Sequence, residues 1–146
     1  MGMFDFIKDA GKKLFGGEAE AAPAADEIKK EIESHGLSAE GLEVAVEGDT
    51  VKVKGKAKSQ DIREKIILAA GNVLGIGKVE EAIETEAAEP ESQFHTVEKG
   101  DSLWAIATKF YGNGSKYNAI FEANKPMLSD PDKIYPGQKL RIPPLD

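Results

Sequence analysis

The run from residue 42 to residue 54 constrains the fold most strongly, because its polarity alternates on both sides of a two-residue turn. Gly48-Asp49 separates two segments in which every second side chain is a large apolar one. This pattern predicts a β-hairpin with one apolar face, formed by Leu42, Val44, Val46, Val51 and Val53. An apolar sheet face has to be covered, so the chain must supply helices that pack on it.

Two segments flanking the hairpin have the spacing of such helices. In the first, over residues 26–35, Asp26 can cap the helix, and Ile28 and Ile32 fall on one side. In the second, Ser59 can cap a helix, and residues 79–83 can follow as a third strand. The inward stripe of the second helix would be Ile62, Ile66, Ala69, Ala70 and Val73. The order αββαβ predicts an α+β domain over residues 26–86.

Residues 94–146 predict a second small domain of βααβ order. Thr96 and Val97 favour a strand, a turn at Gly100 follows, and Asp101 or Ser102 can cap a helix. The apolar side of that helix would be Leu103, Ile106, Ala107 and Phe110. Ser115 can cap a second helix carrying Tyr117, Ile120, Phe121 and Asn124, which Pro126 would end, and residues 134–143 close the domain with a strand.

The remaining segments read as a helix and two linkers. Residues 1–15 space Phe4, Ile7, Gly11 and Leu14 as in an amphipathic helix. We expect this helix to pack on the first domain; a helix for a membrane surface or a partner protein is the alternative. Residues 16–25 are low in complexity and carry no large apolar residue, and residues 87–93 are polar and contain proline, so both predict linkers, the second one flexible.

Composition excludes several classes of function. The chain has no cysteine and a net charge of −7, and residues 16–93 carry 18 acidic against 9 basic side chains. An acidic half argues against nucleic acid as a partner and is compatible with cations. No apolar run is long enough to span a bilayer, and charges interrupt the N-terminus where a signal peptide would be apolar. We expect a cytoplasmic monomer.

Two family resemblances follow from these motifs. The opening at residues 95–107 and the close at residues 134–143 resemble a LysM domain, and the αββαβ order with Gly75–Val79 before its last strand is similar to a BON domain. With the N-terminal pieces Met1-Gly2, Phe4, Phe6 and residues 8–11, with Gly71-Asn72, and with residues 120–128, the chain resembles bacterial cytoplasmic potassium-binding proteins of BON and LysM architecture. This resemblance implies selective binding of K⁺, a conformational response to the ion, and no catalysis.

Backbone carbonyls are the ligands that K⁺ chemistry favours, because neutral oxygens can replace its hydration shell. A helix C-terminus offers unpaired carbonyls and the negative end of its dipole. We therefore predict a carbonyl cage in which Gly75 shapes the loop and the ligands are Ile7, Ala10, Gly71, Val73 and Ile76. The alternative is an ordinary helix cap at Gly71 followed by an ordinary strand entry.

A carboxylate site formed by Glu80, Glu81 and Glu84 is the competing chemistry. No calcium-loop spacing is present, and alternating Glu on a strand is typical of a solvated face. The two histidines, His35 and His95, belong to different domains, and no nucleophile motif is present, so we expect no enzyme.

The LysM resemblance implies a groove for glycans that contain N-acetylglucosamine, such as peptidoglycan. Because peptidoglycan lies outside the cytoplasm, a docking surface for protein is the other interpretation of this groove. Trp104 and Tyr135 can stack on sugars or pack within the domain. The groove residues would be Gly100, Asp101, Ser102, Leu103, Asn124, Pro126, Met127 and Ile134.

Overall fold

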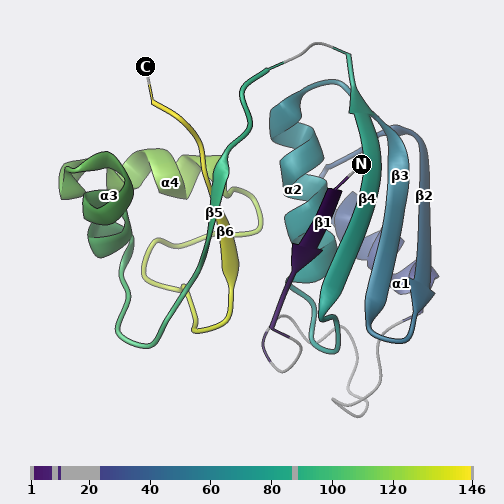
Figure 1. Ribbon diagram of the computed structural model, residues 1–146, viewed down its shortest axis with the longest axis horizontal. Helices are drawn as coiled ribbons and strands as arrows, with labels where there is room; N and C mark the ends of the chain where they lie inside the picture. The colour runs from purple at the N-terminus through teal and green to yellow at the C-terminus, as the bar shows by residue number, and fades with distance from the viewer. Residues whose placement is uncertain (1, 8–9, 11–23, 87–88, 146) are drawn as a thin grey trace.

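Two small α+β domains lie side by side in the protein, with the N-terminal domain on the right and the C-terminal domain on the left of Figure 1. The structure is a computed structural model and describes residues 2–7, 10, 24–86 and 89–145. Within these residues the mixture of helices and strands confirms the predicted α+β class.

The N-terminal domain is a four-stranded sheet in the order β1-β4-β3-β2, with helices α1 and α2 on one face. The hairpin strands β2 (Glu40–Glu47) and β3 (Thr50–Ala57) are antiparallel, and β4 (Lys78–Thr85) runs parallel to β3. Helix α1 spans Ala25–Ser34 and helix α2 spans Gln60–Gly71. Their buried side chains meet the inner face of the sheet in one core, which includes Ile28, Ile32, Val51, Val53, Ile66, Ile67, Val79 and Ile83.

The N-terminus forms a strand where a helix is predicted. β1 (Gly2–Asp5) pairs antiparallel with β4, so the predicted helix over residues 1–15 is wrong for its first residues; residues 8–9 and 11–15 lie outside the described part. The open edge of β4 accepts a strand whose side chains alternate, with Met3 exposed and Phe4 turned towards the core. Tertiary pairing here overrides a local helical periodicity.

Helix capping also departs from prediction at two of the helix starts. Ser59 caps α2 as expected and accepts from the Ile62 amide at 3.2 Å. Helix α1 begins at Ala25, so Ala24 takes the cap position predicted for Asp26, and Asp26 lies in the first turn. The Ala24 amide donates to the Glu27 carboxylate at 3.0 Å, so the amide of the cap residue is paired, while no side chain caps the first helical amides.

The C-terminal domain pairs strand β5 (Gln93–Thr96) with β6 (Lys139–Ile142), antiparallel, and packs two helices on them. Helix α3 (Leu103–Tyr111) is capped by Ser102. A 3₁₀ turn at Gly114–Lys116 precedes α4 (Tyr117–Ala123), so the predicted cap at Ser115 is wrong: Asn113 instead accepts from the Ser115 amide at 3.0 Å. The core is Val97, Leu103, Ile106, Ala107, Ile120, Leu128, Leu140 and Ile142.

The second connecting segment is bound to α2. Glu89 accepts from the Gln60 amide at 3.0 Å, and the Ser92 amide donates to Glu64 at 2.8 Å. Residues 89–92 are therefore docked, and the prediction of a flexible linker is wrong for them. Among the described residues, no helix has the length and apolar character needed to cross a bilayer.

Phe6 tests how firmly the N-terminal segment belongs to the first domain. Its ring is buried in the core, and truncation of a buried Phe leaves a cavity. We expect Phe6→Ala to lower the free energy of unfolding by about 3 kcal/mol in urea titrations. Met3→Ala, at a side chain that is 59% exposed on the same segment, should change it by less than about 0.5 kcal/mol. Equal effects of the two substitutions would contradict the packing.

Candidate functional site

The end of helix α2 turns sharply into the loop that leads to β4. The Asn72 amide closes the last helical turn on Leu68 O at 2.9 Å, and the Ile76 amide donates to Val73 O at 3.1 Å. Gly75 lies between them with φ of +99°, a conformation that a side chain would strain. The last helical carbonyls and the negative end of the helix dipole thus face a tight, mostly buried loop.

The N-terminal segment lies against this loop. The Phe6 amide donates to Gly77 O at 2.9 Å, and the Phe6 ring packs on Gly71 so closely that a Cβ there would collide with it. Beyond Phe6, the Ala10 amide donates to Ile7 O at 3.1 Å. The structure therefore places the N-terminal segment, through Phe6, against the loop after α2.

The C-terminal domain also lies against the N-terminal segment. Gly137, with φ of +92°, approaches Ala10 so closely that a Cβ on it would lie 2.5 Å from the Cβ of Ala10. Lys139 Nζ donates to Asp5 O at 2.6 Å and lies 5.0 Å from the centre of the Phe6 ring.

Asn72 joins the end of α2 directly to strand β6. Its side-chain amide donates to Lys139 O at 2.8 Å and accepts from the Lys139 amide at 2.9 Å. The backbone of an adjacent β-strand would form the same two hydrogen bonds with Lys139. The loop after α2 and the first residue of β6 are therefore fixed to each other.

A buried ion pair holds the middle of α2 to the same strand. Arg141 donates through Nε to Glu64 at 2.8 Å and also bonds the carboxylate of Asp61. Burial raises the pKa of Glu64, but hydrogen bonds from Ser92, Gln60 and Arg141 outweigh it and hold that pKa below its ordinary value. The charged form of Glu64 is therefore the stable one in the folded protein.

The three glutamates of the competing carboxylate site do not come together. Glu81 is buried, so the prediction of a solvated face is wrong for it, and Arg63 donates to it at 3.1 and 2.8 Å. Glu84, in contrast, is exposed. The described part of the chain holds no group of three or more His, Asp or Glu side chains that could bind a metal ion.

Comparison with known proteins agrees with this two-domain architecture. A BON domain matches residues 21–87 and a LysM domain matches residues 95–143. The chain is 44% identical to the potassium binding protein Kbp of Escherichia coli O6:H1 over 98% of its own length and 99% of that protein. The chain belongs to the Kbp family.

Other relatives of this Kbp-family chain share a shorter stretch. The uncharacterized protein YqbP of Bacillus subtilis is 43% identical over 34% of the chain and 26% of YqbP. The resuscitation-promoting factor Rpf of Micrococcus luteus is 45% identical over 32% of the chain and 21% of Rpf. These matches are limited to about a third of the Kbp-family chain.

In the LysM domain of this Kbp-family chain, the eight predicted groove residues differ in accessibility. Gly100, Ser102 and Pro126 are exposed, and Asp101 and Ile134 are half-buried, whereas Leu103 and Asn124 are buried. The Asn124 amide is used within the domain: it donates to Arg141 O at 3.0 Å and accepts from the Arg141 amide at 2.9 Å. Met127 packs against the BON core.

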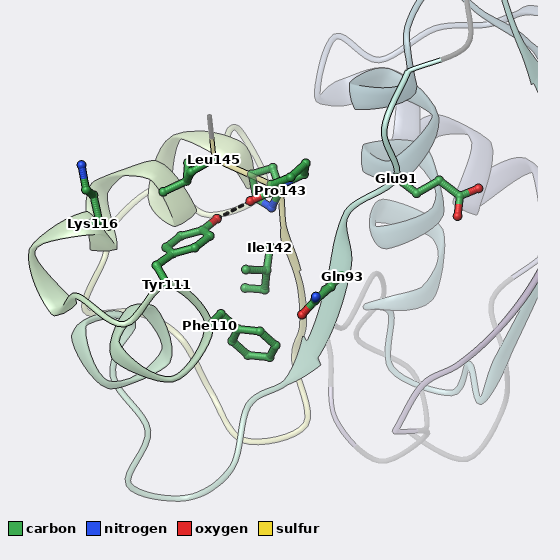
Figure 2. A pocket seen from close by; sticks show the side chains of 9 residues that line it. Glu91, Gln93, Phe110, Tyr111, Lys116, Ile142, Pro143 and Leu145 are labelled. Atoms are coloured by element: carbon green, nitrogen blue, oxygen red, sulfur yellow. Dashed lines mark hydrogen bonds between the residues drawn. The ribbon is translucent and has the colours of Figure 1, made fainter.

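A hollow on the LysM domain lies apart from those eight residues. It measures about 510 Å³, and Phe110, Tyr111 and Ile142 line it beneath the C-terminal residues (Figure 2). The Tyr111 hydroxyl donates to Pro143 O at 2.6 Å across its edge. None of the residues that line it belongs to the predicted glycan groove.

The ion pair between the two domains can be tested by removing one partner. Arg141→Met leaves Glu64 buried without its cation, so we expect a loss of about 3–5 kcal/mol in the free energy of unfolding. Adding Glu64→Gln should recover part of that loss, since no buried charge then remains unpaired. Lys54→Met, which breaks an exposed pair with Glu43, should cost less than about 1 kcal/mol. Urea unfolding monitored by circular dichroism measures all three, and no recovery in the double variant would contradict this account.

Acid should destabilise the fold through the buried carboxylates. Burial raises the pKa of Glu81, but the hydrogen bonds from Arg63 and the Ile83 amide lower it by more. The pKa of Glu81, like that of Glu64, is therefore below its ordinary value of 4.5. The unfolded state then binds more protons than the folded state, and stability present above about pH 4.5 is lost as the pH falls below it. Urea midpoints at pH 7, 5 and 3 should show this loss, and Glu81→Gln should flatten it. Glu84→Gln, on the exposed face, should leave the profile unchanged.

Proposed function

We propose that this protein binds K⁺ reversibly in a cage of backbone carbonyls between the N-terminal segment and the loop after α2. The observation that carries the proposal is the 44% identity to a potassium binding protein over nearly the whole of both chains. The proposed ligands are the carbonyl oxygens of Ile7, Ala10, Gly71, Val73 and Ile76.

The local geometry supports a cage at this place. Phe6, the residue before Ile7, contacts the loop after α2 at Gly77 and Gly71, so the N-terminal segment and the loop are adjacent. A carbonyl oxygen has two lone pairs, so one that accepts a hydrogen bond can still face a cation. The end of α2 adds a negative partial charge, and no side-chain carboxylate is required.

We further propose that the ion stabilises the docked arrangement of the N-terminal segment and the loop. A ligand shifts a conformational equilibrium only by its difference in affinity for the two states. A cage with ligands from two segments has that difference, because it is complete only when the segments meet. Gly137 and Asn72 carry the effect to the LysM domain, since both lie at the junction.

A glycan in the LysM groove is the competing function. Asn124 and Leu103 are buried, and the Asn124 side-chain amide is hydrogen-bonded to the Arg141 backbone. A glycan would therefore have to bind through the exposed remainder of the groove. No observation in the described residues favours this function over K⁺ binding.

Calorimetry with a matched glycine pair tests the cage. Titration with KCl should give a measurable heat of binding, and titration with NaCl or a chito-oligosaccharide should give a smaller heat. Gly75→Ala strains the loop at φ of +99°, so we expect it to weaken K⁺ binding by about tenfold. Gly112→Ala makes the same change at φ of +72° at the end of α3 and should leave K⁺ affinity unchanged.

Two results would contradict the proposal. Heat from the sugar without heat from K⁺ would favour the glycan function. Equal affinities of the two glycine variants and the unaltered protein would show that K⁺ binds elsewhere.

A further inference from the structure

One lysine of the LysM domain holds its charge beside the proposed ion site. Lys139 Nζ donates to Asp5 O at 2.6 Å and lies 5.0 and 6.0 Å from the ring centres of Phe6 and Phe4. A carbonyl oxygen and two aromatic faces are groups that attract a cation. The ammonium group is therefore bound to the N-terminal segment itself.

The position of this charge is fixed from both ends of the side chain. The backbone of Lys139 is paired with the Asn72 amide through two hydrogen bonds, and the ammonium is anchored on β1. Burial lowers the pKa of Lys139, and the nearby charge of Asp5 raises it in part. A charge held in a partly buried place is screened less by water than one on a mobile surface side chain.

The distance to the proposed cage is short. Two residues of extended chain span at most about 7 Å, so Ile7 O lies within about 10 Å of Lys139 Nζ when the 2.6 Å contact to Asp5 O is added. At such a distance two positive charges repel each other appreciably unless the medium is fully aqueous. The neighbouring elements offset this only in part: Asp5 is exposed and lies opposite Lys78 in register, while Asn72 and Thr96 are uncharged.

We propose that Lys139 is a fixed positive charge that weakens K⁺ binding, so that the LysM domain sets the affinity of a site to which it contributes no ligand. This inference rests on the proposed K⁺ site. It requires that Lys139 act on the ion through its charge, and not through the position of the N-terminal segment.

Removal of the charge distinguishes these two roles. Lys139→Met keeps the apolar stem against the rings, and we expect it to bind K⁺ about fivefold more tightly, from Coulomb's law at about 10 Å and an intermediate dielectric. Lys116→Met changes the net charge equally on the side of the LysM domain away from the BON domain (Figure 2), and its K⁺ affinity should match that of the unaltered protein. The advantage of Lys139→Met should shrink when N-methylglucamine chloride raises the ionic strength.

Equal or weaker K⁺ binding by folded Lys139→Met would overturn the inference and make Lys139 a positioning residue. A second measurement needs no variant: because linkage is reciprocal, K⁺ should lower the pKa of the Lys139 ammonium, read from its side-chain NMR signals. An unchanged titration with K⁺ bound would also overturn it. If no protein of the set binds K⁺, the proposed function itself has failed.

Discussion

The buried ion pair between Glu64 and Arg141 is the interaction on which the arrangement of the two domains depends. Two charges buried at a domain boundary cost more than they return unless each is fully paired. Glu64 is paired by Arg141, Gln60 and Ser92, and the Arg141 backbone is held in turn by Asn124. The interior of the LysM domain is thus linked by hydrogen bonds, through Arg141, to helix α2 of the BON domain.

Helix α2 consequently serves both domains along its whole length. Its first turn binds the connecting segment at Glu89, its middle binds β6, and its final residue leads into Asn72, which binds β6 again. Its other side lies in the BON core. A change in the loop after α2 therefore acts on an element that the LysM domain already contacts.

The parts of this structure that the sequence predicted are those with local signals. The hairpin alternates around Gly48-Asp49, and Ser59 precedes a regular apolar stripe, so both could be placed. β1 could not, because its partner β4 lies more than seventy residues away and Phe4 and Ile7 also fit a helix. The glycines of the loop after α2 allowed this loop to be proposed as part of the ion site. Lys139 and Arg141 lie in a short strand, and the sequence does not indicate which residues they contact.

Neutral ligands make the surroundings of an ion site important. A carboxylate ligand would dominate the electrostatics of a cation, whereas a carbonyl cage leaves the affinity open to fixed charges outside it. Beside the proposed site one such charge is Lys139, held by contacts that also join the domains. Docking of the LysM domain would then place a positive charge beside the ion at the same time as it brings Gly137 against Ala10. The two effects oppose each other, so a tighter interface between the domains would not by itself give a tighter ion site.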